Sequence, residues 1–413
     1  MLYSNPLQSC RLCDSDLLLK VLPLADTPAG DRYLPKKESP EKLPVFPLSL
    51  SQCKACGHVQ LSNIVNPSYL YRDYIYTTSS SLGLTEHFAN YAEATTNKLS
   101  LKPGSFVVEI GSNDGTMLRA FRNMGMRVIG IDPAKEIARK ATEEGIPTLP
   151  EFFSKEIAAQ ISSEFGHADL IVANNVMANV PDVKLIIEAV KQLLAPDGVF
   201  VFETGYLKYL AEDIVFDNIY HEHIDYYSVR PLKTFFHSMG MQLFDVVETR
   251  SKGSSIRCFI GHSCKSREVS KAIFHMIERE NSLGYHTPLP FVELSNKLTA
   301  TKEKLHSILE DAKSKRKQIA GFGASVGVTT VLYEFELGRF IESLLDDNPA
   351  REGLVSPGMS IPVYLAEKQF LCNPPDLVVI LSWRYAAQIL NKHHRSKSKP
   401  PKFLTFFPEV TII

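Results

Sequence analysis

The middle of the chain alternates short apolar runs with stretches of helical periodicity. Val107–Ile110 is apolar except for Glu109, and a turn from Gly111 to Gly115 follows it. After the turn, apolar residues recur at helical spacing, at Met117, Leu118 and Phe121. Short apolar runs are typical of parallel strands buried on both faces, and the spacing that follows is typical of an amphipathic helix. The pattern therefore predicts a strand, a turn and a helix.

The same alternation extends over about residues 106–247 and returns near residue 318. Asp169–Ala173 and Gly198–Phe202 predict two more strands in the first region, and Asp376–Leu381 and Phe403–Phe407 predict strands in the second. Strands that alternate with helices form parallel sheets covered by helices. We therefore predict an α/β protein with two Rossmann-like domains, preceded by a small N-terminal module.

Two C-x-x-C pairs define that N-terminal module: Cys10 with Cys13, and Cys53 with Cys56. Each pair can place two thiolates on one metal ion, and four thiolates close a tetrahedral zinc site without an open position. Such a site is structural, and it would stabilise a module whose Pro- and Lys-rich middle could hardly fold alone. His58 would serve as a ligand only if one cysteine did not. We therefore predict a structural Zn2+ ion.

The turn from Gly111 to Gly115 has the features of a nucleoside-binding site. Its glycines allow the backbone to approach a ligand closely, and the following helix begins with free N–H groups. The next predicted strand, Arg127–Ile131, ends in Asp132, at about the place where an acidic residue meets the ribose hydroxyls in a Rossmann-type unit. The turn lacks the G-x-G-x-x-G pattern, so it is not the usual dinucleotide-binding turn.

Other polar residues stand where the predicted strands end, and ligands of parallel sheets bind beyond the carboxyl ends of the strands. These residues are Asp114, Asn174 and Glu203, together with Glu109 inside its strand. Phe152 and Phe153 follow in the same region and are either a wall for an adenine ring or two core residues.

Tyr220–Tyr227 is the second segment that indicates chemistry, because it contains two histidines, two acidic residues and three tyrosines. Burying so many polar side chains in an apolar core is unfavourable. The alternative is a solvated polar loop. The H-E-x-x-H spacing of helical zinc sites is missing. A histidine beside a carboxylate and a phenol can remove a proton next to a ketone and stabilise the enolate.

The composition narrows the classes of function. At 413 residues the chain is long enough for two or three domains. The formal net charge is −1 and no long basic run occurs, which argues against a nucleic-acid partner. No apolar run approaches the length of a membrane span, and no signal-peptide core is present, so we expect a cytoplasmic enzyme without a membrane partner. We expect a monomer or a dimer.

Taken in order along the chain, the motifs resemble one known family. They are the two C-x-x-C pairs, E-I-G-S-N-D-G at 109–115, I-D-P at 131–133, Y-H-E-H-I-D-Y-Y-S at 220–228, G-F-G-A-S at 321–325 and D-D-N-P at 346–349. This order is similar to that of the S-adenosylmethionine-dependent sugar C-methyltransferases of deoxysugar biosynthesis, which build branched sugars of antibiotics and bacterial surface polysaccharides. The resemblance covers nearly the whole chain.

The resemblance implies three domains and a reaction. It implies a zinc-binding module over residues 1–65, a methyltransferase domain with a helical lead-in over 66–300, and over 301–413 a Rossmann-like domain that helps to hold a nucleotide-sugar. The reaction would add a methyl group from S-adenosyl-L-methionine to carbon 3 of a nucleotide-linked 4-keto-deoxysugar, through an enolate.

The resemblance also implies roles for single residues. His223 would be the base, Tyr220 and Glu222 would orient it or stabilise the enolate oxygen, and Tyr76 would close over the sugar. Asp132 would bind the ribose hydroxyls. The methionine end of the cofactor would be wrapped by Gly111, Ser112, Asn113 and Gly115. Further cofactor-binding candidates are Glu109, Asp114, Pro133, Phe152, Phe153 and Asn174.

Two positions depart from the family pattern. Asn179 stands where members often carry a histidine, and an asparagine cannot act as a base near neutral pH, although it could position the keto oxygen. Gly327 stands in the C-terminal glycine turn where many members have a lysine. The nucleotide carrier therefore stays open among dTDP, GDP and others.

Three other functions remain open on the sequence. An O-methyltransferase could use the same base on a sugar hydroxyl or on another small molecule. A zinc-ribbon RNA methyltransferase would share the cofactor turn and the cysteines, but it should carry a basic, aromatic-rich surface. A binding protein that had lost catalysis is the third, and it would not need the His-Glu-His segment.

Overall fold

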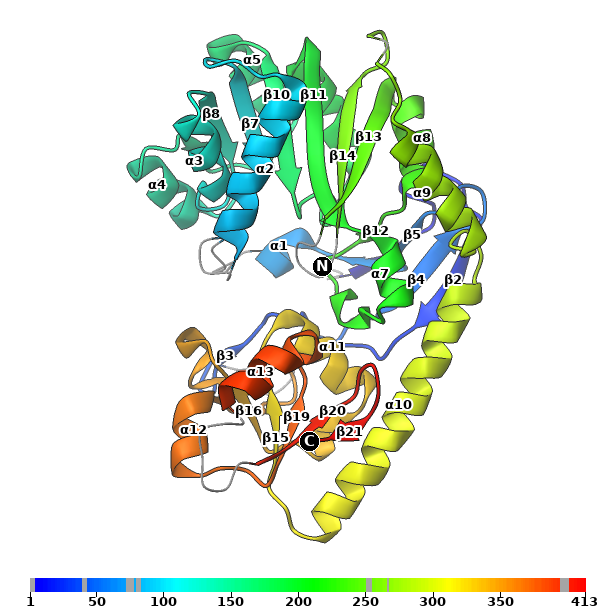
Figure 1. The fold of residues 1–413 in the computed structure, drawn as a ribbon, viewed down its shortest axis with the longest axis vertical. Coiled ribbons are helices and arrows are strands. Elements are labelled where there is room, and N and C mark those ends of the chain that lie inside the picture. Colours follow the sequence, from blue (N-terminus) through cyan, green and yellow to red (C-terminus); the bar gives the residue numbers. More distant parts are fainter. Residues whose placement is uncertain are drawn as a thin grey trace.

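The computed structural model describes residues 4–38, 43–71, 78, 83–249, 255–265, 267–393 and 401–413. Within these residues the larger sheets have seven, four and six strands. Figure 1 shows the seven-stranded sheet in the upper half of the molecule, the six-stranded sheet in the lower half, and the long helix α10 (Leu289–Ser314) along one side.

The seven-stranded sheet has the order β13-β14-β11-β10-β7-β8-β9. Its strands are β7 (Phe106–Ile110), β8 (Arg127–Ile131), β9 (Thr148–Leu149), β10 (Ala168–Asn174), β11 (Leu194–Gly205), β13 (Met241–Thr249) and β14 (Ser255–His262). The pairs from β11 to β9 are parallel, whereas β14 is antiparallel to both of its neighbours. The strands predicted from the apolar runs lie within β7, β10 and β11, which confirms the predicted α/β sheet.

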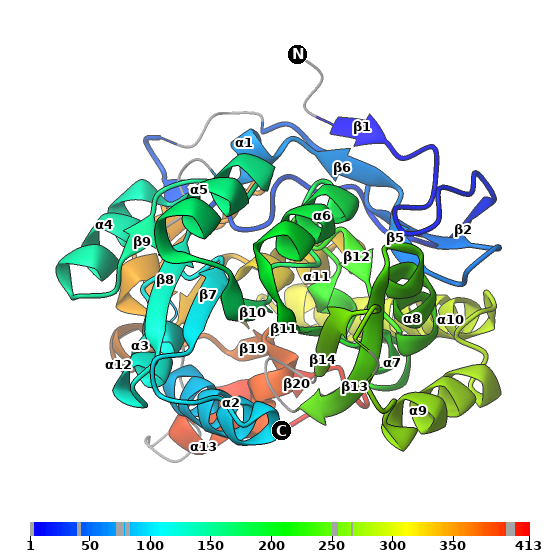
Figure 2. The same cartoon turned by 90° about the horizontal axis from the view of Figure 1, so that it is seen from above.

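The sheet is buried on both faces, as the apolar runs require. Val107 packs on one face with residues of α2 (Leu84–Leu99) and α3 (Thr116–Asn123), and Val108 packs on the other with α5 (Lys155–Phe165) and α6 (Val183–Leu193). Successive side chains of a strand point to opposite faces, so strands buried on both faces are apolar at most positions. Figure 2 shows the two pairs of helices on opposite faces of the sheet.

The N-terminal module forms a four-stranded sheet with a strand from a distant part of the chain. The order is β12-β5-β4-β2, with β2 (Leu18–Pro23), β4 (Ser49–Cys53), β5 (Val59–Leu61) and β12 (Asp225–Tyr226). β1 (Ser4–Pro6) pairs with β6 (Asn63–Val65), which precedes α1 (Pro67–Tyr71). β12 pairs with β5 through Asp225 and Gln60, so the module is joined directly to the end of the His-Glu-His segment.

The C-terminal sheet is a second Rossmann-like sheet, as predicted. Its order is β18-β16-β15-β19-β20-β21. The strands are β15 (Ile319–Phe322), β16 (Ser343–Asp346), β18 (Val363–Leu365), β19 (Leu377–Ile380), β20 (Lys402–Thr405) and β21 (Thr411–Ile412). Its helices are α11 (Val326–Glu334), α12 (Ala366–Cys372) and α13 (Ala386–His393). β3 (Leu34–Pro35) pairs with β17 (Leu354–Val355), so the N-terminal module also contacts this domain.

The remaining helices of the upper half are α4 (Lys135–Glu143), α7 (Leu207–Glu212), α8 (Val229–Ser238) and α9 (Lys271–Ser282). In α10, buried Leu294, Leu298, Leu305 and Leu309 recur at helical spacing. None of the helices in the described ranges combines the length and apolar composition that a membrane crossing needs.

Candidate active site

A cavity of about 620 Å³ opens beyond the carboxyl ends of β7, β8 and β10. Most of the predicted cofactor-binding residues line it: Glu109, Gly111, Ser112, Asn113, Asp132, Pro133, Phe152, Phe153 and Asn174. Asp114 and Gly115 lie outside the lining. Gly115 is the N-cap of α3, and the Asp114 carboxylate accepts a hydrogen bond from the Thr116 hydroxyl at 2.6 Å, so both shape the start of the helix.

The glycine turn is fixed by backbone geometry. Gly111 has φ +70° and Gly115 has φ +72°, in the left-handed region that favours glycine. A Cβ atom on Gly111 would clash with Val176. The Asn113 N–H donates to Asp132 Oδ2 at 2.9 Å, and Asn113 Oδ1 accepts from the Thr78 N–H at 2.8 Å. The turn is therefore tied to the acidic residue that ends the next strand.

Polar atoms without partners point to a ligand in the cavity. Among the described residues, four buried side-chain atoms that lack a hydrogen-bond partner belong to residues of the lining: Glu109 Oε2, Ser112 Oγ, Asn174 Oδ1 and Asn179 Oδ1. Buried polar atoms are usually paired, because leaving them unpaired costs about 1–3 kcal/mol each. The amino-acid and ribose groups of S-adenosylmethionine offer the donors and acceptors that these atoms need.

Two further features fit the same cofactor. Burial raises the pKa of Glu109 well above its usual range, and the nearby carboxylates of Asp132 and Asp114 add to this effect. A cationic ligand in the cavity would relieve that repulsion. The Phe152 side chain lines the cavity although it is 60% exposed, so an aromatic face is available to a planar base.

The four predicted metal ligands lie together. The Sγ atoms of Cys10, Cys13, Cys53 and Cys56 are all within 4.8 Å of one another, with two Sγ–Sγ distances of 3.6 Å. Four thiolates at tetrahedral Zn–S distances would be about 3.8 Å apart, so the cluster fits zinc. The predicted substitute ligand His58 has another role, because its Nε2 lies 2.9 Å from Asp225 Oδ1.

The predicted base makes two hydrogen bonds that define its tautomer. His223 Nδ1 lies 3.0 Å from the carbonyl oxygen of Asn218, which can only accept, so Nδ1 carries the proton. His223 Nε2 then accepts from the Tyr220 hydroxyl at 2.8 Å. Nε2 is therefore the basic nitrogen, and the phenol is its immediate neighbour.

Glu222 and His221 differ in their surroundings. Burial raises the pKa of Glu222 to about 8, and the Asp31 carboxylate contributes to the shift. Burial lowers the pKa of His221 to about 4, and its ring packs against Phe46 at a centroid distance of 5.5 Å. At neutral pH Glu222 is thus largely protonated and His221 is neutral.

The predicted catalytic residues fall into three groups in the structure. Asn179 lines the cavity. Tyr220, Glu222 and His223 lie outside its lining, in a segment joined to the Asn179 loop by the hydrogen bond from the Ile224 N–H to the Ala178 oxygen, at 2.6 Å. Tyr76 lies outside the described residues.

A buried charged cluster beside the cavity was not predicted as a unit. Glu203, which follows the apolar run in β11, accepts from Arg257 Nη2 at 2.8 Å, and its other oxygen lies 2.7 Å from His87 Nε2. Leu84, one helical turn before His87, and Phe88, which directly follows His87, line the cavity. Their spacing along the predicted helix is the signal that could have found His87.

Comparison with known families covers most of the chain in three parts. Residues 10–71 match the model of a zinc binding domain, residues 84–246 match a methyltransferase domain, and residues 250–408 match a C-methyltransferase C-terminal domain. The third match begins just before β14, so the sequence family boundary falls inside the seven-stranded sheet.

Single relatives agree with these matches. The chain is 30% identical over 410 residues to the C-methyltransferase NovU of Streptomyces niveus, covering 99% of this chain and 97% of the relative. A ubiquinone biosynthesis O-methyltransferase of Actinobacillus pleuropneumoniae is 33% identical over 111 residues, covering 24% of this chain and 46% of that protein.

Solved structures resemble the chain only distantly. The magnesium protoporphyrin IX methyltransferase from Synechocystis PCC 6803 with bound SAM has a TM-score of 0.32 and 12% identity, covering 43% of this chain and 78% of that one. The family therefore rests on the full-length relative and the family models. The predicted family resemblance is confirmed, and the chain belongs to the zinc-binding, S-adenosylmethionine-dependent C-methyltransferases.

Proposed function

We propose that this C-methyltransferase adds a methyl group to carbon 3 of a nucleotide-linked 4-keto-deoxysugar. The observation that supports the proposal most strongly is the hydrogen-bonded pair of Tyr220 and His223, with Nδ1 of the histidine bonded to a backbone carbonyl. A methyltransferase that acts on oxygen starts from a nucleophilic atom. One that acts on an unactivated carbon must first make that carbon nucleophilic.

A ketone next to the target carbon provides the required acidity. His223 Nε2 takes the proton from carbon 3, the electrons of the C–H bond form the carbon–carbon double bond of the enolate, and the charge moves to the oxygen on carbon 4. S-adenosylmethionine would supply the methyl group that carbon 3 gains, with the bond between that methyl group and sulfur broken and S-adenosylhomocysteine released. Juxtaposing the two reactants lowers the barrier, by about 7–11 kcal/mol in favourable cases.

The enolate oxygen requires hydrogen-bond donors. With its pKa raised to about 8, Glu222 is largely protonated at neutral pH and can donate, as a neutral carboxylic acid does in other enolate-forming sites. Once Nε2 carries the proton from carbon 3, the Tyr220 hydroxyl no longer donates to that nitrogen and can donate to the enolate oxygen. The Asn179 amide is a further donor. Asn179 therefore acts as a hydrogen-bonding residue in this proposal, and His223 is the base.

We assign the nucleotide to the C-terminal domain, facing the His-Glu-His segment. The two are close: the Thr330 hydroxyl donates to the Ile219 oxygen at 2.8 Å, and Arg384 pairs with Asp217 at 3.0 Å. A Cβ atom on Gly327 would lie 2.6 Å from the Asp217 oxygen, so no larger side chain fits there without a shift. A nucleotide diphosphate would have to be bound without a lysine at this position.

The proposal can be tested with a panel of dTDP-linked and GDP-linked 4-keto-deoxysugars. We expect a product whose added methyl group is bonded to carbon 3, as located by NMR. His223→Ala should abolish turnover while retaining cofactor binding, and His237→Ala, at an exposed histidine of α8, should match the unmodified protein. A methyl group on oxygen would contradict the proposal.

A further inference from the structure

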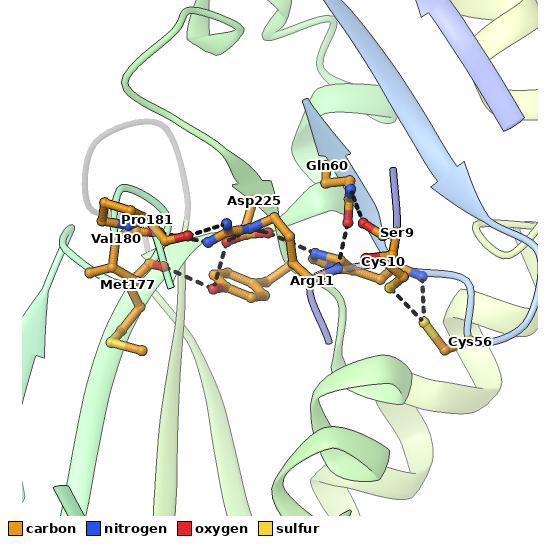
Figure 3. A network of polar contacts seen from close by, with 11 residues as sticks. Ser9, Cys10, Arg11, Cys56, Gln60, Met177, Val180, Pro181 and Asp225 are labelled. Carbon is orange, nitrogen blue, oxygen red and sulfur yellow. Dashed lines mark hydrogen bonds and ion pairs between the residues drawn. The ribbon is translucent and has the colours of Figure 1, made fainter. Parts of the chain in front are cut away.

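Arg11 connects the N-terminal module, which contains the four cysteines, to the wall of the cofactor cavity. It stands between the ligands Cys10 and Cys13, yet its side chain extends away from the sulfur cluster (Figure 3). Its Nε lies 2.9 Å from Asp225 Oδ1 and 3.0 Å from Oδ2. Its two terminal nitrogens each donate at 2.6 Å, to the oxygens of Pro181 and Val180. We call these contacts the Arg11 clamp.

The acceptor of the clamp is itself fixed in place. The Asp225 side chain is fully buried and that of Arg11 is 6% exposed. His58, from the second cysteine pair, bonds to Asp225 Oδ1 at 2.9 Å, and the Tyr227 hydroxyl lies 3.2 Å from Oδ2. A guanidinium whose three nitrogens all donate to fixed acceptors is a rigid connection, which a lysine could not reproduce.

The clamp bonds to a loop whose backbone is held on both sides of Asn179. Tyr227 donates to the Met177 oxygen at 2.8 Å, and the Ile224 N–H donates to the Ala178 oxygen at 2.6 Å. Arg11 binds the next two carbonyls after Asn179. The carbonyls of 177, 178, 180 and 181 are thus all bonded, while the Asn179 side chain lines the cavity with a buried oxygen that has no partner among the described residues.

We propose that Arg11 is a positioning residue, through which the N-terminal module holds Asn179 in its position in the cofactor cavity. Zinc bound by the cysteines on either side of Arg11 would fix the backbone from which the guanidinium extends. The hydrogen bonds of the clamp then hold the backbone of Val180 and Pro181, which also line the cavity, in a fixed position. The role of Asn179 toward the acceptor rests on the proposed function, but the clamp itself does not.

Three variants test the clamp. Arg11→Ala removes it, and Arg11→Lys keeps the charge without the planar fork. Asp225→Asn weakens the acceptor at a residue whose substitution leaves the sequence of the N-terminal module unchanged. Lys54→Ala is the matched control, because Lys54 occupies the same place in the second C-x-x-C pair but is exposed. We would measure zinc per chain, the affinity for S-adenosylhomocysteine by calorimetry, and amide hydrogen exchange by mass spectrometry.

With zinc retained, we expect Arg11→Ala to bind S-adenosylhomocysteine at least tenfold more weakly, with Arg11→Lys and Asp225→Asn between it and the unmodified protein. Faster exchange should be confined to residues 176–182 and 224–225, and Lys54→Ala should change nothing. Unchanged affinity and exchange in both Arg11→Ala and Asp225→Asn would overturn the proposal. These measurements use no sugar, so they stand even if the proposed acceptor is wrong.

Discussion

At the scale of single residues, the raised pKa of Glu222 leads to a pH dependence. If the protonated carboxyl donates to the enolate oxygen, kcat should fall about tenfold per pH unit above pH 8, because the donor is then lost. Glu222→Gln keeps a donor that does not titrate, so it should abolish this alkaline decline. The measurement is kcat against pH at saturating substrates.

The same group affects stability with a defined sign. Its folded-state pKa of about 8 exceeds the ordinary value of 4.5, so the folded state binds the proton more tightly. The contribution of Glu222 to the free energy of unfolding is therefore fully present below pH 4.5 and is lost as the pH rises through 8. Glu143→Gln, at an exposed carboxylate of α4, is the control and should change neither profile. An unchanged alkaline decline in Glu222→Gln would exclude the carboxyl as the donor.

Gly111 offers a second test at this scale. Gly111→Ala adds a methyl group that clashes with Val176 at a residue with φ +70°, so we expect a loss of stability of about 1–3 kcal/mol and at least tenfold weaker cofactor binding. Gly166→Ala also places an alanine at a positive φ, +89°, but no atom lies within 4 Å of the new Cβ. Equal cofactor affinity in the two variants, by calorimetry, would show that Gly111 does not approach the ligand.

The site residues that could be predicted from the sequence are those whose role follows from their place next to a predicted strand or helix. Two glycines before a helix and an acid after the next strand are visible without tertiary contacts, and the structure brings them to one cavity. Asp225 was not identifiable as the partner of Arg11, because their contact spans more than half of the chain. The separate environments of His221 and His223 likewise depend on distant neighbours such as Phe46.

At the scale of elements, α2 joins the cavity to the buried Glu203 cluster. Glu203→Gln would leave Arg257 without its charge partner, and breaking a buried pair costs about 3–5 kcal/mol. Glu144→Gln removes an exposed partner of Arg119, for which about 0–1 kcal/mol is expected. Urea denaturation measures both, and equal losses would mean that the Glu203 pair behaves as a surface pair.

Most elements could be predicted because their apolar periodicity is long and regular. Apolar residues at helical spacing predict a helix over about Leu84–Lys98 and a helical connector over about 291–316, and the structure has α2 and α10 there. β12 could not be predicted from the sequence. Its two residues lie in a polar segment, and they form a strand only because β5 of the N-terminal module pairs with them.

In the whole molecule, the N-terminal module is paired with both of the other domains. Its strand β5 pairs with β12, from the chain of the methyltransferase domain, and its strand β3 pairs with β17 of the C-terminal domain. We therefore expect a chelator that removes zinc to lower the thermal unfolding midpoint of the whole protein and to weaken S-adenosylhomocysteine binding, with both restored by added zinc. Differential scanning calorimetry follows the first effect. A separate low-temperature transition with the main midpoint unchanged would indicate an independent module.

In the proposed reaction, the hydrogen on carbon 3 leaves as a proton and a methyl group takes its place. The most direct measurement uses a nucleotide-linked 4-keto-deoxysugar with deuterium in place of hydrogen on carbon 3, and NMR of the purified product. We predict a carbon-bound methyl group at carbon 3 and one deuteron fewer there for each methyl gained. A methylated product that retains all of its deuterium and carries the methyl group on oxygen would contradict the account.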